Sequence, residues 1–166
     1  YNLSKKIMYQ VFGFYKFKKI TFLEKLKAEL TIKLLKFKLR GNIILSPEGI
    51  NGTISGKKLS ISKFSKIIKS KIKISNFDSQ NYSESRFQPF HKGKIKIKKE
   101  VVPMGIVVSQ KDRNKKKYLN VNKWNKLITN KETLVIDARK PFEYEVGTFK
   151  SAINPNIKHF RDFPNY

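Results

Sequence analysis

Cysteine is absent from this 166-residue sequence, and alanine occurs only three times. Without cysteine, the chain can form no disulfide, no thiolate metal site and no cysteine nucleophile. Long apolar runs are also missing, since no stretch approaches the length that spans a membrane. The N-terminal segment lacks the apolar core and the cleavage site of a signal peptide. These absences predict a cytoplasmic protein with no membrane partner.

Acidic residues are scarce too. The chain has 12 Asp and Glu residues against 37 Lys and Arg, which gives a formal net charge of +25. Such a charge favours polyanionic partners, above all nucleic acid. The high charge can also be explained by composition, because 32 of the cationic residues are lysine and five are arginine, which is the bias of an AT-rich genome. Nucleic acid is therefore the favoured class of partner, but the net charge alone does not distinguish nucleic-acid binding from compositional bias.

The first forty residues predict a strand followed by a helix. Residues 7–17 are dense in aromatic and β-branched side chains, as in a long strand. Thr21 and Glu24 fit a capping box at the start of a helix over 22–35. The helix has an apolar stripe at every fourth residue, which consists of Phe22, Leu26, Leu30 and Leu34.

A glycine-rich stretch over 41–56 predicts a tight β-hairpin. Residues 42–45 and 50–54 form its two buried strands, and residues 46–49 form the turn. Gly52 predicts either a bulge or a close approach of another backbone. Glu48 places one acidic side chain at the tip of the hairpin.

The next segments complete a recognisable order of elements. A second helix is predicted over 60–70, capped by Ser60 or Ser62, with 71–75 as a short strand or a helix extension. Residues 76–86 are polar and predict a loop. Residues 94–98, KIKIK, alternate with the period of a strand. The resulting βαββαβ order predicts an α+β ferredoxin-like, or acylphosphatase-like, domain over 1–105.

The remaining residues predict a second, incomplete domain. A basic linker over 106–119 precedes a helix over 121–128 and a short buried strand over 133–136. Asp137 and Arg139 lie at the end of this strand. Helical turns are predicted over 142–146 and 157–163. A strand, a polar strand end and a helix are typical of the start of an α/β domain over 120–166.

Four motifs link the two halves of the chain. They are FYKF at 14–17, LSPEGINGTISG at 45–56, KIKIKKEVVPMG at 94–105 and YEVGTFKSAINPNIKHFRDFP at 144–164. With DARKPFEYEVGTF at 137–149, they resemble the rhodanese-domain tRNA uridine 5-hydroxylases. The resemblance implies a rhodanese domain that begins near residue 120, tRNA rather than DNA as partner, and hydroxylation of the wobble uridine to 5-hydroxyuridine. It implies molecular oxygen as co-substrate and no cofactor bound in this chain.

The chain departs from this family at the reactive residue. The family's active-site cysteine lies in a later loop of the rhodanese domain, and this chain contains none. The resemblance therefore implies that the chain is the N-terminal part of a longer enzyme and is inactive alone. Two alternatives stay open: a rhodanese-type sulfurtransferase that uses the same missing cysteine, and a stand-alone basic RNA-binding module.

The KIKIK strand supplies the RNA-binding candidates. Alternate strand residues lie about 7 Å apart, close to the phosphate repeat of an extended nucleic-acid strand. The candidates on and around this strand are Lys94, Lys96, Lys98, Lys99, Arg86 and His91. The alternative is an ordinary edge strand, whose lysines prevent pairing with other sheets.

Two further pairs are candidates for the site. Asp137 and Arg139 could form part of an active-site wall, or they could only fix the end of their strand. Glu48 and Asn51 could dock the two domains or shape the path of the tRNA. The two histidines, His91 and His159, are isolated in the sequence and predict no metal site.

The sequence also bears on two other activities. The aromatic residues between Tyr9 and Phe17 could stack bases on a sheet surface, but core packing explains them better. Acylphosphatase chemistry needs an arginine in a phosphate-binding loop after the first strand. The segment that follows this strand, KFKKITF, has neither an arginine nor glycines, which argues against that activity.

Overall fold

The computed structural model describes residues 8–102 and 119–166, which belong to two compact units, Tyr1–Val101 and Val102–Tyr166. The predicted basic linker lies almost entirely outside the described residues. The first unit contains a five-stranded sheet with two long helices, and the elements within residues 119–166 of the second unit are short.

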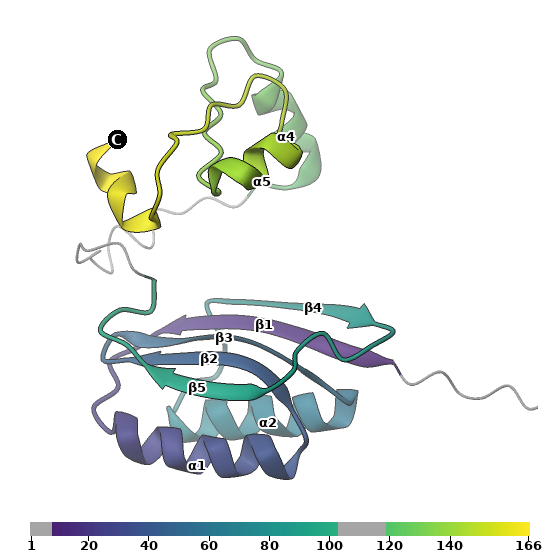
Figure 1. Ribbon diagram of the computed structural model, residues 1–166, viewed down its shortest axis with the longest axis vertical. Coiled ribbons are helices and arrows are strands. Elements are labelled where there is room, and N and C mark those ends of the chain that lie inside the picture. Colours follow the sequence, from purple (N-terminus) through teal and green to yellow (C-terminus); the bar gives the residue numbers. More distant parts are fainter. Residues whose placement is uncertain (1–7, 103–118) are drawn as a thin grey trace, which may run out of the picture. The chain divides into compact units, whose positions relative to one another are not determined.

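The first unit confirms the α+β ferredoxin-like prediction. Its elements in chain order are β1 (Tyr9–Phe17), α1 (Leu23–Lys36), β2 (Arg40–Ser46), β3 (Gly49–Gly56), α2 (Lys58–Lys71), β4 (Ser79–Ser85) and β5 (Gly93–Ile97). The strand order across the sheet is β4-β1-β3-β2-β5, with β5 parallel to β2 and the other neighbours antiparallel. Both helices pack on the same face of the sheet (Figure 1).

The core lies between this face and the two helices. The predicted stripe of α1 is buried at Leu26, Leu30 and Leu34, and α2 contributes Ile61, Phe64 and Ile68. The strands supply Phe12, Phe14, Ile43, Leu45, Ile50 and Ile54. Because side chains alternate along a strand, the residues between these point to the opposite side of the sheet, which we call the outer face.

The hairpin of β2 and β3 has a two-residue turn, Pro47-Glu48, closed by the pair Ser46 and Gly49. Its ladder is continuous, so the predicted bulge at Gly52 is absent. A close approach is present instead, because a Cβ atom at Gly52 would lie 3.1 Å from the Phe14 ring. Gly52 therefore lets an aromatic ring of β1 pack closely against β3.

The polar loop predicted over 76–86 was wrong, because Ser79–Ser85 forms the edge strand β4. This strand buries little surface, so it lacks the apolar alternation that identifies strands in a sequence. Tyr82 stacks on Phe12 with ring centroids 4.7 Å apart and holds β4 against the core. The KIKIK segment is consequently not the last strand of the βαββαβ unit. It is a fifth strand, β5, on the opposite edge.

The predicted helix caps were also wrong. The N-cap of α1 is Phe22, which makes no side-chain capping bond and is 44% exposed, instead of Thr21. The N-cap of α2 is Lys57, again without a side-chain bond. At α1 the preceding loop is held by the hairpin instead, since the N–H of Ile20 donates to the carbonyl of Pro47 over 3.0 Å. Tertiary contacts replace the local cap that the sequence suggested.

The second unit contains α4 (Val121–Ile128), α5 (Pro141–Val146) and a 3₁₀ helix, η1 (Phe160–Asn165). The buried strand predicted over 133–136 was wrong. Only Ile136 forms a bridge, parallel to Ile153, and Leu134 is 66% exposed. Trp124 of α4 packs edge-on against Phe149, with ring centroids 5.3 Å apart.

Candidate functional site

A row of three lysines, Lys94, Lys96 and Lys98, follows β5 on the outer face. Ile95 is buried beneath the row, and all three lysines are exposed, as the alternation predicted. The N–H of Lys98 donates to the carbonyl of Leu45 over 2.8 Å, so the ladder continues one residue past the strand. Among the described residues, none of the three ammonium groups has a carboxylate partner. The row is therefore available to an external anion.

The lysine row borders a polar and aromatic surface. Asn42 of β2 pairs in register with Lys94, and Ile44 pairs with Lys96. Asn51 of β3 pairs with Ile44, so this candidate also belongs to the outer face. Many protein surfaces that bind single-stranded RNA combine cations, which contact phosphates, with amide and aromatic groups.

The aromatic residues of β1 divide between the two faces. Phe12 and Phe14 are buried in the core and stack on each other at 4.8 Å, as predicted. Tyr9, Tyr15 and Phe17 lie on the outer face and are partly buried. Core packing thus explains two of these five aromatic residues.

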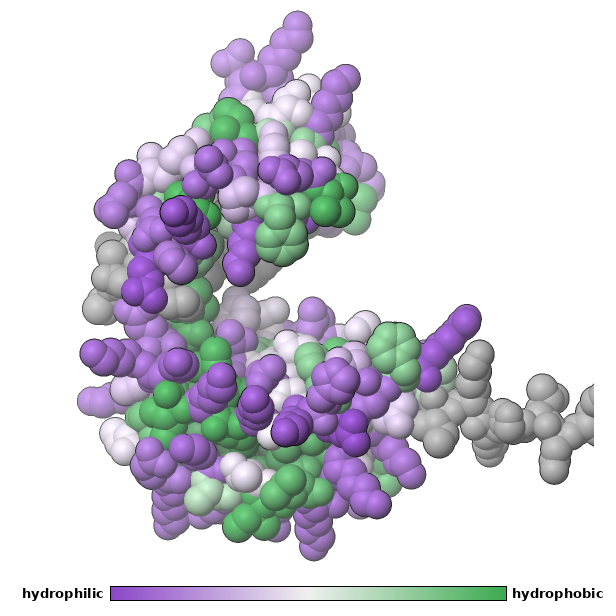
Figure 2. All heavy atoms as spheres, in the orientation of Figure 1, coloured by the Kyte–Doolittle hydropathy of each residue, from purple (hydrophilic) through white to green (hydrophobic). Residues whose placement is uncertain are grey.

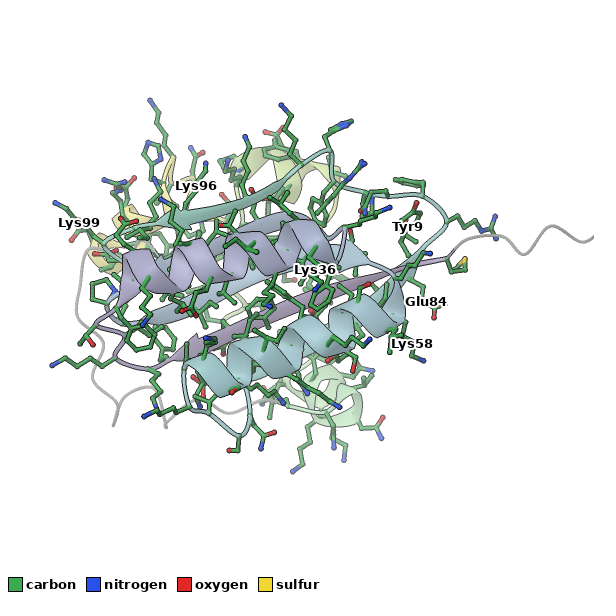
Figure 3. All side chains as sticks on the ribbon, turned by 90° about the horizontal axis from the view of Figure 1, so that it is seen from below. Tyr9, Lys36, Lys58, Glu84, Lys96 and Lys99 are labelled. Carbon is green, nitrogen blue, oxygen red and sulfur yellow. The ribbon has the colours of Figure 1, made fainter. Side chains whose placement is uncertain are left out.

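The other RNA-binding candidates lie at different places. Lys99 follows the row, and Figure 3 shows it with Lys96 on the β5 side of the domain. Arg86 and His91 lie at the two ends of the segment that joins β4 to β5, and both are exposed. The structure therefore brings Lys99 close to the row, while Arg86 and His91 belong to the end of the sheet where β5 begins.

Glu48 has a defined partner. Its carboxylate accepts a hydrogen bond from the N–H of Val101 over 2.6 Å, and Val101 is 2% exposed. The tip of the hairpin thereby fixes the last residue of the first unit. Asn51 does not take part in this contact. The two candidates consequently have separate positions, one at the unit's end and one on the outer face.

The loop between β1 and α1 is not built as a phosphate cradle. The N–H of Lys18 donates to the carbonyl of Glu48 over 2.9 Å, and that of Ile20 donates to Pro47. The ammonium group of Lys18 donates to the carbonyl of Lys73 over 2.9 Å. These three donors are therefore engaged within the fold.

Asp137 and Arg139 form a close ion pair in the second unit. The Nη2 and Nε atoms of Arg139 lie 2.6 and 2.9 Å from the Asp137 carboxylate, and Nη2 also donates to the carbonyl of Gly147 over 2.6 Å. Thr148 donates its hydroxyl to the same carboxylate over 2.8 Å. The pair thus ties the Ile136 bridge to the turn after α5. It also lines a cavity of about 650 Å³ with Trp124.

These contacts determine the charge state of the pair. Hydrogen bonding from the Arg139 side chain holds the pKa of Asp137 far below its usual range, against a smaller opposing effect of burial. The same hydrogen bond raises the pKa of Arg139. Asp137 is therefore an anion throughout the neutral range and is unsuited to act as a general acid there.

Sequence reasoning missed two contributors to these sites. Asn154 donates its amide to the carbonyls of Asp137 and Arg139, at 2.8 and 2.9 Å, and so holds the polar segment in place. Arg40, the first residue of β2, lies on the outer face two residues before Asn42. The period-two pattern of β2 could have placed Arg40, whereas no local pattern marks Asn154.

The described residues also bear on membrane insertion and on metal binding. None of the helices in residues 8–102 and 119–166 has the length and apolarity that a bilayer crossing requires. Over the same ranges, no group of three or more His, Asp or Glu side chains is arranged to hold a metal ion.

The sheet order, the two helices on one face and the hairpin define an acylphosphatase-like α+β domain. Residues 9–101 match the family model described as the UPF0176 acylphosphatase like domain, and the chain belongs to this family. Among solved structures, an acylphosphatase from Coxiella burnetii aligns with 58% of this chain and 100% of its own, at 12% identity and a TM-score of 0.41. This distant likeness carries no functional argument.

Curated relatives match nearly the whole chain. A protein named tRNA uridine(34) hydroxylase from Pelagibacter ubique is 55% identical over 163 residues, which cover 96% of this chain and 52% of the relative. A protein of the same name from Legionella pneumophila is 34% identical over 154 residues, which cover 93% of this chain and 60% of the relative. The chain thus spans between about half and three fifths of the relatives' length.

Proposed function

We propose that this chain is the N-terminal part of an enzyme that converts uridine 34 of tRNA to 5-hydroxyuridine. The observation that carries the proposal is the 55% identity, over nearly the whole chain, to a protein named tRNA uridine(34) hydroxylase. The aligned stretch of 163 residues extends over both units. The lysine row of β5 adds independent support, because an enzyme acting on tRNA needs a surface that binds phosphates.

In this proposal the first unit holds the RNA. Lys94, Lys96 and Lys98 contact successive phosphates, while Asn42 and Asn51 lie beside the row, where a sugar or a base edge would pass. Phosphate contacts fix the position of an RNA strand but do not read its sequence. The choice of uridine 34 therefore falls to residues outside the row.

The second unit supports the reaction without carrying it. Asp137 and Arg139 hold the end of a strand-like segment and the turn after α5 in one arrangement. We assign them a positioning role beside a rhodanese-type reactive loop in the part of the relatives that this chain does not match. Molecular oxygen is the proposed source of the added hydroxyl oxygen, and the cytoplasm, where tRNA is modified, is the proposed location.

The proposal is tested by analysing tRNA from cells with and without the complete gene. Nucleosides from digested tRNA are measured by mass spectrometry. Deletion should remove 5-hydroxyuridine and the nucleosides derived from it, and the intact gene should restore them. Loss of a thiolated uridine instead would support the sulfurtransferase. An unchanged set of modified nucleosides would leave a stand-alone RNA-binding protein as the better reading.

A further inference from the structure

A second cationic feature lies at the end of the sheet where β5 begins. It is a cavity of about 870 Å³, bordered by the end of α1, the start of β2, the end of β3 and the segment before β5. Its cationic side chains come from four different segments and are Lys36, Lys38, Arg40, Lys57 and Lys92, with His91 beside them. Its lining also includes Tyr9, Ser60 and Gln88, but no acidic residue.

The cations of this cavity differ in how well the fold explains them. Lys36 ends α1, where a positive charge interacts favourably with the helix dipole. Lys57 is the N-cap of α2, where the same dipole disfavours a cation. Lys58 follows it, and the first turn of α2 contains no acidic residue. The helix dipole therefore gives the charge of Lys57 no stabilising role in the fold.

The cavity continues the lysine row. Lys92 lines the cavity and precedes Lys94 by two residues, the period of β5. Arg40 also lines the cavity and lies on the outer face, one alternation before Asn42, which pairs with Lys94. Figure 3 shows Tyr9 and Lys58 toward one end of the domain, Lys96 and Lys99 toward the other, and Lys36 between them. The cations thus extend from the cavity along β5.

Two other surfaces within residues 8–101 differ from the cavity. Figure 2 shows hydrophilic and hydrophobic side chains side by side around β5, and a hydrophobic area over α1. The latter includes Ile32 and Leu35, which are 63% and 67% exposed. Glu84 of β4 lies near Tyr9 and Lys58 in Figure 3 but does not line the cavity. Among these surfaces, the cavity alone joins concave shape, clustered cations and continuity with the row.

We propose that the cavity is a second phosphate-binding site, which takes a phosphodiester group of the same RNA strand that the lysine row binds. The inference rests on the proposed function and deepens it, because it fixes the course of the RNA. The strand runs along β5 on the outer face and enters the cavity between α1 and α2. Arg40 and Lys92 bridge the two parts. The charge of Lys57 then serves binding, although the dipole of α2 does not favour it.

The test uses the 166-residue chain and a labelled single-stranded RNA of twelve nucleotides. Binding is measured between 50 and 200 mM salt for wild type, Lys36→Gln/Lys57→Gln and the control Lys63→Gln/Lys66→Gln. The control removes two exposed charges from α2 away from the cavity. Loss of two phosphate contacts should flatten the salt slope by about 1.4 and reduce the salt sensitivity over this range about sevenfold. The control should leave the slope unchanged.

A second measurement separates binding from folding. Lys57→Gln should raise the midpoint of thermal unfolding of the first unit, since it removes a cation from the positive end of α2, while it weakens RNA binding. A residue retained for structure would lower both. Inorganic phosphate, compared with chloride at constant ionic strength, should raise the unfolding midpoint of wild type more than that of the Lys36→Gln/Lys57→Gln variant.

Several outcomes would overturn the inference. One is an unchanged salt slope in the cavity variant, and another is an equal loss in the control. A phosphate effect on stability that depends on Lys36 and Lys57, without any effect on RNA binding, would assign the cavity to a free anion instead. These measurements need no modification activity. RNA binding that depends on the cavity, in a protein whose deletion leaves tRNA nucleosides unchanged, would refute the proposed function and leave the binding site standing.

Discussion

Replacing Lys94, Lys96 and Lys98 with glutamine tests whether the row binds phosphates. Glutamine keeps an extended polar side chain and removes the charge. The three side chains are exposed, and no described carboxylate pairs with them, so the fold should be retained. Far-ultraviolet circular dichroism and thermal unfolding close to wild type would verify this. Any change in binding then reports on the interface.

The expected magnitude follows from counterion release. Each phosphate contact contributes about 0.7 to the salt slope for a single strand and about 0.9 for a duplex, so three contacts contribute about two to three units. For a single strand, wild type should lose about 20-fold more affinity than the variant between 50 and 200 mM salt. Fluorescence anisotropy of a labelled anticodon stem-loop RNA measures the affinity of wild type and of the variant at each salt concentration.

A matched control removes the same number of charges from the helix side. Lys25, Lys63 and Lys66 are exposed on α1 and α2, and their replacement with glutamine should leave the slope near that of wild type. Equal slopes for the row variant and wild type would refute phosphate binding by β5. If the row variant and the control lost equal amounts of salt slope, net charge alone would govern binding. That result would favour the explanation by AT-rich composition.

Three further predictions concern the folds of the two units. Glu48→Ala leaves the buried N–H of Val101 without its acceptor and should destabilise the first unit by about 1.5 kcal/mol in urea unfolding followed by circular dichroism; an unchanged midpoint would show that the contact is not needed. Leu30→Ala opens the fully buried centre of α1 and should cost about 3 kcal/mol in the same assay, and a loss below 1 kcal/mol would contradict the described core. Asp137→Asn breaks the pair with the arginine and should lower the midpoint of the second unit, read from the fluorescence of Trp124, the only tryptophan. Because the pKa of Asp137 is lowered in the folded chain, this stabilisation is complete above the unfolded value of about 3.9 and is lost as the pH falls through the folded pKa, so the difference between wild type and variant should vanish only in strong acid. A difference that persisted there would exclude the carboxylate as its source.

The sequence predicted those elements whose residues bury an apolar face. The four-residue stripe at Leu26, Leu30 and Leu34 identified α1, and the alternation of KIKIK identified β5 together with its exposed lysines. β4 could not be found in this way. It lies at the sheet edge, and Tyr82, its only large apolar side chain, is itself 51% exposed. The strand forms because the backbone of β1 offers a free edge, which is a tertiary property.

The predictions of the N-cap residues of α1 and α2 were wrong for a related reason. Thr21 and Glu24 matched a local rule, yet the loop before α1 is fixed by bonds to the hairpin tip, 27 residues away in the case of Ile20 and Pro47. The cavity could not be predicted from the sequence either. Lys36, Arg40, Lys57 and Lys92 meet only because α1 ends, β2 and β5 begin and β3 ends at the same end of the sheet.

The structure also distinguishes lysines that form ion pairs from lysines that do not, a difference that the sequence does not reveal. Lys16 pairs with Asp78 over 2.6 Å, and Lys71 pairs with Glu29 over the same distance. The row on β5 has no such partners among the described residues. Composition treats all of these as one excess of charge, whereas three-dimensional placement identifies the cations that remain available to an external anion.

The most direct test joins the row to the modification of tRNA. A strain without the gene is complemented with the complete wild-type gene, with the Lys94→Gln/Lys96→Gln/Lys98→Gln variant or with the Lys25→Gln/Lys63→Gln/Lys66→Gln control, at matched protein levels. The amount of 5-hydroxyuridine and its derivatives at position 34 is then measured by mass spectrometry. Wild type and control should restore the modification, and the row variant should restore far less at limiting protein. Full restoration by the row variant, or none by wild type, would contradict the account.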